Sequence, residues 1–237
     1  MIRETAPAPA LVRIPAGAFV MGGTGDDKFV TDTERPAHRV TIARAFALGR
    51  HPVTVGEYRA FAPAHAPGDG PALPAVNVSW DEACAYCVWL RAETGESFRL
   101  PTEAEWEYAC RAGNRAPFAT GDEIDSGAAN FLYSEEGRRI GPGGRTPVGQ
   151  YPANAFGLHD LHGNVCEWVE DAWHPGYAGA PVDGSAWAES GEADRRVIRG
   201  GAWDYLPRLL RSAWRDSLPR AHRRDNLGFR VAVSAAV

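Results

Sequence analysis

Three Ser/Thr-x-x-Glu motifs constrain the fold more than any other feature of the chain. They begin at Thr54, Ser79 and Thr102. In such a capping box, the hydroxyl and the glutamate carboxylate each accept a hydrogen bond from a backbone N–H that the first turn of a helix leaves unpaired. The motifs therefore predict three short helices. They cover about residues 55–61, 80–94 and 103–111.

The second of these segments also shows which of its faces is buried. Apolar side chains recur at Trp80, Ala83, Cys87 and Leu90, at spacings of three, four and three residues. Because a helix turns once in about 3.6 residues, these positions share one face. We expect that face to pack against the core.

The rest of the chain is rich in turns. Its 26 Gly and 18 Pro among 237 residues predict many irregular loops. Loops dominate after Gly113, and so long an irregular region needs something rigid to organise it, such as a bound cation. Strand-like patterns occupy residues 11–15, 18–23, 38–42, 45–49, 197–201 and 228–233. We predict one α+β domain over residues 11–237, after a loose tail over residues 1–10.

Charge and hydropathy argue against two classes of partner. The net charge of −5 gives no electrostatic reason to bind nucleic acid or an anionic membrane surface. No apolar run reaches the roughly 18–20 residues that span a bilayer. The first ten residues lack the apolar segment of a signal peptide. We therefore expect a cytoplasmic protein that binds neither nucleic acid nor membranes.

The four cysteines are Cys84, Cys87, Cys110 and Cys166. Cys84 and Cys87 form a C-x-x-C pair, which can serve redox chemistry or zinc binding. Such a redox pair is activated at a helix N-terminus, whereas these two lie past the first predicted turn. No second pair completes a zinc site. We expect all four to be small core residues of a protein in a reducing compartment.

His159 and His162 form an H-x-x-H pair, but no third metal ligand lies near them in the sequence. The chain shows no Ser-His-Asp or nucleophile-elbow pattern. It also lacks a glycine loop that opens a helix to bind phosphate. These motifs identify no catalytic centre.

Several longer motifs occur together in one order. The most specific are FRLPTEAEWEYA over residues 98–109, DLHGNVCEW over 160–168, RGG over 199–201 and NLGFR over 226–230. In this order they resemble the formylglycine-generating enzyme (sulfatase-modifying factor) family over residues 11–235. The resemblance implies an irregular, C-type-lectin-like α+β fold with little regular secondary structure, three short helices and short strands.

The chain departs from that family where its oxidases bind copper(I). Those enzymes use two cysteines shortly after the Gly-Gly motif, as suits a soft metal. Counted back from Asn226, the two positions fall near Ala202 and Pro207, which cannot bind metal. A pocket tryptophan of the oxidases is Cys166 here. We therefore expect neither copper binding nor oxidation of cysteine to formylglycine.

The resemblance also implies structural calcium. It places one site at Asp160, the carbonyls of Gly163 and Val165, and Glu167. It places a second at Asn130 and the carbonyl of Phe131. The carboxylate expected to complete the second site falls on Ile140, which weakens that site. Oxygen donors on a glycine-containing turn suit calcium, which would hold the loops together.

The segment in place of the copper loop still offers candidate binding residues. Together with its neighbours it supplies Cys166, Trp203, Asp204, Tyr205, Arg208, Arg211, Trp214 and Arg215. Arginine and aromatic side chains interleaved on loops suit an anionic or planar ligand. The alternative is a solvated rim of ordinary Arg–Asp pairs.

Two functions follow from the resemblance. One is a calcium-stabilised binding or accessory module for a peptide, a small molecule or a partner protein. The alternative is an oxidoreductase or tailoring enzyme that uses another metal or other residues, as relatives in sulfur transfer and siderophore maturation do. The sequence leaves open whether the protein is an enzyme.

Overall fold

The computed structural model describes residues 8–25, 27–66 and 68–234. Its helices are α1 (Val55–Phe61), α2 (Trp80–Thr94) and α3 (Glu103–Arg111). All three capping boxes are formed in both directions, with the hydroxyls of Thr54, Ser79 and Thr102 accepting from the glutamate N–H three residues on. The predicted helix starts are confirmed.

The first sheet joins the two ends of the described chain. Its order is β1 (Leu11–Ile14), β4 (Phe46–Gly49), β10 (Ala232–Ser234) and β5 (Phe98–Arg99), with all neighbours antiparallel. Of the expected tail, residues 1–7 lie outside the described chain. Ala10 is attached, since its carbonyl accepts a hydrogen bond from Arg50 N at 2.7 Å.

The second sheet has the order β8 (Arg215–Pro219), β7 (Glu192–Arg199), β6 (Cys166–Trp173) and β9 (Leu227–Phe229). Strand β6 lies inside it, antiparallel to β7 and parallel to β9. Strand β6 could not be predicted from sequence, because nearly all its side chains are buried and the alternation of a half-buried strand is missing.

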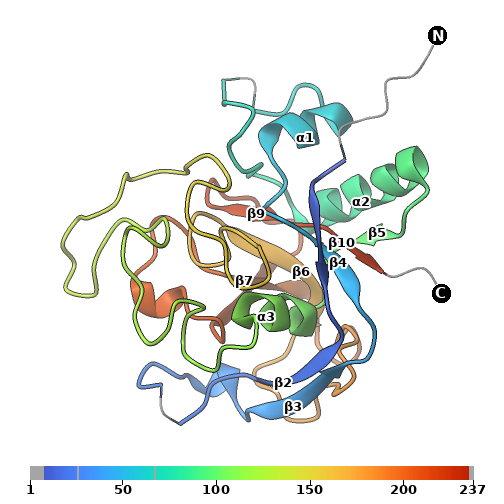
Figure 1. Ribbon diagram of the computed structural model, residues 1–237. Coiled ribbons are helices and arrows are strands. Elements are labelled where there is room, and N and C mark those ends of the chain that lie inside the picture. Colours follow the sequence, from blue (N-terminus) through green and yellow to red (C-terminus); the bar gives the residue numbers. More distant parts are fainter. Residues whose placement is uncertain (1–7, 26, 67, 235–237) are drawn as a thin grey trace.

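A hairpin of β2 (Gly17–Met21) and β3 (His38–Ile42) completes the strands. Short 3-10 turns lie at η1 (Asp32–Glu34) and η2 (Pro207–Leu209). Figure 1 shows α1 and α2 at one end of the molecule, the hairpin at the other and α3 between them.

The core surrounds α3 and one face of α2. Every residue of α3 is buried, including Glu103, Glu105, Glu107 and Arg111. On α2 the predicted apolar face is confirmed, since Ala83, Cys87 and Leu90 are buried and Trp80 is partly so. Charged groups inside the core need partners, and these partners shape the site described below.

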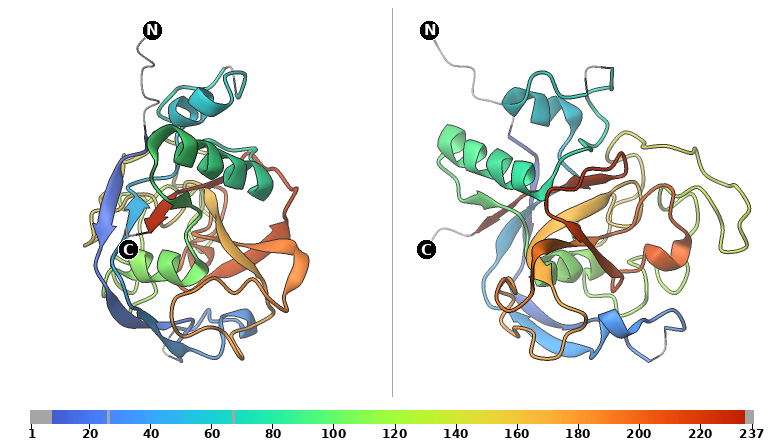
Figure 2. Two further views of the ribbon diagram at one scale, coloured as in Figure 1. Left: turned by 90° about the vertical axis from the view of Figure 1, so that its right-hand side faces the viewer. Right: turned by 180° about the vertical axis from the view of Figure 1, so that it is seen from behind.

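Between α3 and β6, residues 112–165 contain isolated bridges but no named helix or strand. This confirms the predicted loop-rich region, which forms the side of the molecule away from the first sheet (Figure 2). Within the described ranges, no helix has the length and apolar character that crossing a membrane requires.

Candidate functional site

The site is built on the loop between β7 and β8. Gly200 and Gly201 open it with left-handed φ angles of +90° and +67°. A Cβ on Gly201 would lie 2.6 Å from the carbonyl oxygen of Leu209, so only glycine lets the loop fold back this closely. The Trp203 N–H then donates to the Asn164 carbonyl at 3.0 Å, and Tyr205 N–H to that of Ala202 at 3.0 Å.

Two aromatic rings and one thiol make the next set of contacts in this loop. The Tyr205 and Trp214 rings meet edge to face, with centroids 5.6 Å apart. The Tyr205 hydroxyl reaches the buried thiol of Cys166, the first residue of β6. Burial raises the pKa of both groups, so thiol and phenol remain protonated at neutral pH. Cys166 therefore packs as a neutral thiol and is not an activated nucleophile.

Two exposed carboxylates, Asp204 and Asp216, belong to the same part of the chain. Asp204 is exposed, and both its oxygens accept from Asn226 Nδ2, at 2.8 and 3.1 Å. Asn226 is buried, and its backbone carbonyl accepts from Cys166 N–H at 2.8 Å, which holds the backbone of Asn226 against β6. Asp216 on β8 is also exposed and accepts from Ser217 N–H at 2.7 Å. Among the described residues, neither carboxylate forms an ion pair with arginine, lysine or histidine.

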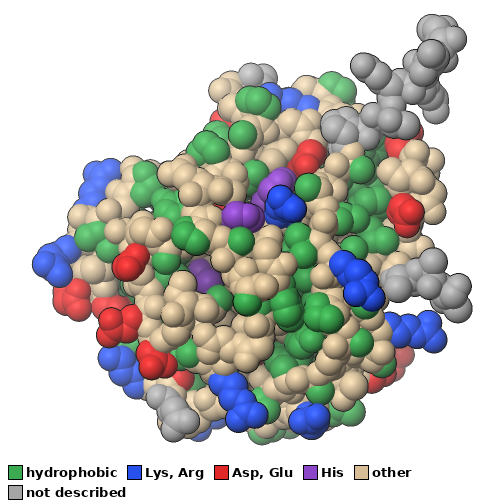
Figure 3. Space-filling view, viewed as in Figure 1, with side chains coloured by type: hydrophobic (Ala, Val, Ile, Leu, Met, Phe, Trp, Pro, Cys, Tyr) green, Lys and Arg blue, Asp and Glu red, His purple; other side chains and the backbone are tan. Residues whose placement is uncertain are grey.

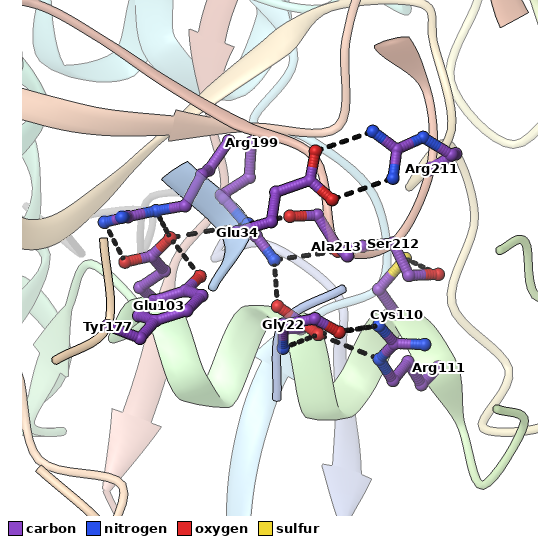
Figure 4. Close-up of polar contacts among 12 residues, drawn as sticks. Gly22, Glu34, Glu103, Cys110, Arg111, Tyr177, Arg199, Arg211, Ser212 and Ala213 are labelled. Atoms are coloured by element: carbon purple, nitrogen blue, oxygen red, sulfur yellow. Dashed lines mark hydrogen bonds and ion pairs between the residues drawn. The ribbon is translucent and has the colours of Figure 1, made fainter. Parts of the chain in front are cut away.

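The structure corrects the prediction for Arg211 and Arg215, which do not lie on a recognition surface. Arg211 is buried and donates to both oxygens of Glu34, at 2.6 and 2.8 Å (Figure 4). Arg215 is buried against Glu103, with bonds of 2.7 and 2.9 Å. Arg208 stays at the surface, but its guanidinium pairs with Glu135 at 2.8 Å.

Arg211 and Arg215 belong to a set of buried ion pairs that the sequence did not reveal. Four arginines and four acids form two groups of ion pairs: Arg211 with Asp27 and Glu34, and Arg111, Arg199 and Arg215 with Glu103 and Glu107. The charges balance, as buried ions require. Burial opposes the charged form of Glu107, but Arg111 and Arg199 outweigh it and lower the pKa of that carboxyl. The network ties the loop before β8 to α3 and to η1, so its role is to hold the site.

Copper(I) does not fit this site. Ala202, where the first cysteine was expected, is buried and has no donor side chain. Pro207, at the second position, begins η2. The thiol of Cys166 is a single soft donor, and copper(I) requires more than one.

The first predicted calcium set fits in part. Both Glu167 oxygens accept from Arg230, at 2.6 and 2.7 Å, and one also accepts from Trp106 Nε1 at 2.8 Å. A cation would have to share this carboxylate with a guanidinium. Asp160 Oδ2 accepts from Gly149 N–H at 2.7 Å, while its Oδ1 is buried without a partner. That free oxygen is available to a cation.

The second predicted set also contains a buried side-chain oxygen that has no hydrogen-bond partner. Asn130 is buried, and its amide nitrogen donates to Gly144, Thr146 and Asn164. Its Oδ1 has no partner. Ile140, which stands where a carboxylate was expected, is 43% exposed and supplies no oxygen from its side chain. Calcium remains a prediction at both sites.

The histidine and C-x-x-C pairs do not form metal sites. His162 Nδ1 contacts the Leu210 carbonyl at 2.7 Å, and its Nε2 accepts from Ala119 N–H at 3.0 Å. His159 Nδ1 contacts the Tyr151 carbonyl at 2.7 Å. Histidines are visible near the middle of the face in Figure 3. No group of three His, Cys, Asp or Glu side chains able to hold a metal occurs in the described part of the chain.

One buried cluster of polar side chains could not be predicted from the sequence. The Cys110 thiol lies 3.7 Å from His162 Nε2 and 3.5 Å from Ser212 Oγ. All three side chains are buried, and His162 already spends both ring nitrogens on backbone groups. The cluster packs the end of α3 against the site loop. Only the fold brings these residues together, so no sequence spacing could have found it.

The two small sheets, the three capped helices and the loop after Gly200 define a formylglycine-generating-enzyme fold. The sulfatase-modifying factor enzyme 1-like domain matches residues 1–235, and the chain belongs to this family. The resemblance and the irregular α+β fold inferred from sequence are both confirmed.

Among curated proteins, the chain is 32% identical over 235 residues to the formylglycine-generating enzyme of Mycobacterium tuberculosis, covering 70% of this chain and 75% of that enzyme. It is 31% identical over 264 residues to hercynine oxygenase of Mycolicibacterium thermoresistibile, covering 90% of this chain and 56% of that protein. It spans only 24% of serine/threonine-protein kinase pkn1 of Chlamydia caviae, at 39% identity over 67% of this chain.

Among solved structures, the chain is similar to PvdO from Pseudomonas aeruginosa. The two are 39% identical, with a TM-score of 0.85 over 95% of this chain and 94% of PvdO. The similarity therefore covers nearly the whole of both chains.

Proposed function

We propose that this chain is a ligand-binding or accessory member of the family that does not oxidise cysteine to formylglycine. Its ligand is a peptide, a small molecule or a segment of a partner protein bound at the loop of residues 202–206.

The proposal is carried by the construction of that loop. Positions that would supply thiolates hold Ala202 and Pro207, while Tyr205 closes the space against Cys166 and Trp214. The loop is also rigid, because Asn164, Asn226 and the buried arginines hold it at several points. A rigid loop with aromatic side chains binds a ligand with little loss of conformational entropy.

A second candidate is a tailoring oxidoreductase. Its support is the 31% identity to hercynine oxygenase, a protein named as an oxygenase. The match covers only 56% of that protein, so the identity says nothing about catalytic or metal-binding groups in the rest of it. Another metal would need ligands such as Cys166, His159 and His162, and among the described residues these do not form a metal-binding group.

Two measurements separate these candidates. The purified full chain is loaded with copper or iron, desalted and analysed by plasma mass spectrometry. It is then incubated aerobically with a cysteine-containing sulfatase peptide, with a formylglycine-generating enzyme as positive control. We expect neither metal to be retained in stoichiometric amount and the peptide mass to stay unchanged. Stoichiometric copper or iron would overturn the binding-module proposal in favour of the oxidoreductase.

We also propose calcium as a structural ion, supported by the unpaired oxygens of Asp160 and Asn130. Hard cations favour such oxygen donors. Elemental analysis of the protein as purified should find calcium, and its removal by EDTA should lower the melting temperature. Unchanged melting after complete removal would contradict a structural role.

A further inference from the structure

One buried carboxyl group connects the loop of residues 174–191 to the start of α3. Asp171 on β6 is only 4% exposed, and its two oxygens accept hydrogen bonds from different parts of the chain. Its Oδ1 accepts from Trp187 N–H in the loop, and its Oδ2 from Glu103 N–H at the first residue of α3, both at 2.7 Å. Asp171 forms no ion pair within the described ranges. When ionised, it is therefore a buried charge without a counter-ion, which is unfavourable.

The charged groups that face Asp171 do not neutralise it. Glu103 on α3 is itself paired with buried arginines, and it and Glu170 on β6 repel the charge of Asp171. Arg196 on β7 attracts that charge but forms no ion pair with it. Burial, followed by the repulsion from Glu103, raises the pKa of Asp171 to about 7, although the two N–H donors oppose the change.

The loop is held at Trp187 by its ring as well as by this hydrogen bond. The ring stacks on that of His174, with centroids 3.5 Å apart and planes within 5°. Further along, the Gly184 carbonyl accepts from Thr102 Oγ1 at 2.9 Å, and the loop passes beside β3 (Figure 1). When the loop moves away at Trp187, water reaches the carboxyl of Asp171 and can hydrate its charged form.

We propose that Asp171 makes the closure of this loop depend on pH. With a proton on Asp171 the loop stays closed over α3, and loss of that proton favours opening at Trp187. The sign follows from linkage, because the closed loop holds the proton more tightly than the open loop does. Opening is therefore least favourable below the ordinary pKa of aspartate, about 3.9, and increases until the pH reaches the raised value of the closed loop.

Amide hydrogen exchange of the full chain at pH 5 and pH 7 measures this opening. After correction for the intrinsic exchange rate, the Trp187 N–H should lose protection by about tenfold or more between the two pH values. It should also be less protected at both values than the Cys166 N–H, which is bonded to the Asn226 carbonyl in the core. Constant protection of Trp187 would overturn the proposal. Equal protection of the two amides would also overturn it, because the loop would then open only with the whole fold.

Two variants assign the effect to one carboxyl group. Asp171→Asn keeps an oxygen for the Trp187 N–H but cannot ionise, so the loss of protection between pH 5 and pH 7 should disappear. The matched control is Asp183→Asn, which removes an exposed carboxylate of the same loop and should leave that loss unchanged. If the loss persists in Asp171→Asn, another group such as His174 is responsible and the assignment is overturned.

A titration of the unmodified chain needs no variant to fold. The carboxyl carbon of Asp171, followed by NMR, should titrate with a midpoint near pH 7. A midpoint near the ordinary value of about 4 would contradict the proposal, because the closed loop would then hold the proton no more tightly than the open one.

Discussion

Breaking the buried pair of Arg211 and Glu34 should destabilise the fold far more than breaking a similar pair at the surface. Glu34 is fully buried, and Arg211 holds both its oxygens and also reaches Asp27 at 2.7 Å. Arg211→Met leaves the Glu34 charge inside the protein without its partner. Removing one partner of a buried pair costs about 3–5 kcal/mol.

The chain offers a matched control. Arg223 donates to both oxygens of Glu82, at 2.9 Å each, in the same two-bond arrangement. These side chains are 49% and 41% exposed, so water can replace the lost contact. Arg223→Met should therefore cost less than about 1 kcal/mol.

Urea unfolding at pH 7, followed by tryptophan fluorescence, measures both changes. The midpoint should fall clearly for Arg211→Met and hardly for Arg223→Met, with equal dependence on urea. Combining Arg211→Met with Glu34→Met should recover part of the loss, because the fully buried Glu34 charge is then gone and only Asp27, whose side chain is 10% exposed, is left without the guanidinium. Equal losses for the two arginine variants, or no recovery in the double variant, would refute the reasoning.

Three further predictions concern stability. Thr102→Ala removes both the cap of α3 and a bond to the Gly184 carbonyl, and should cost about 1–2 kcal/mol in urea unfolding. Gly201→Ala should cost about 2 kcal/mol or more because it adds a clash with Leu209 to an unfavourable φ, whereas Gly95→Ala, with φ +79° in open space, should lose only about 1 kcal/mol. Glu107 has a lowered pKa, so its stabilisation is complete above the unfolded value of about 4.3 and is lost as pH falls through the folded value. Unfolding free energies measured from pH 3 to 7 should therefore decline on acidification, and less steeply in Glu107→Gln.

The parts of the fold that sequence could predict depend on neighbours in the chain. A capping box joins residues three apart, so Thr54, Ser79 and Thr102 revealed the helices directly. Strand β6 could not be predicted, because burial on both faces removes the periodicity that marks a strand.

The site was predictable only in composition. Asp204 is exposed and Trp203 and Tyr205 are half-buried, while Arg211 and Arg215 are held inside by acids 177 and 112 residues away. An arginine looks the same in sequence whether its partner is water or a buried carboxylate.

The sequence alone determined the family and the helix starts, because each depends on residue identity or on contacts a few positions apart. Tertiary structure decided which charges are buried, which carboxylates stay free and which rings line the site. Those outcomes depend on desolvation, and the surroundings that desolvate a side chain come from distant parts of the chain.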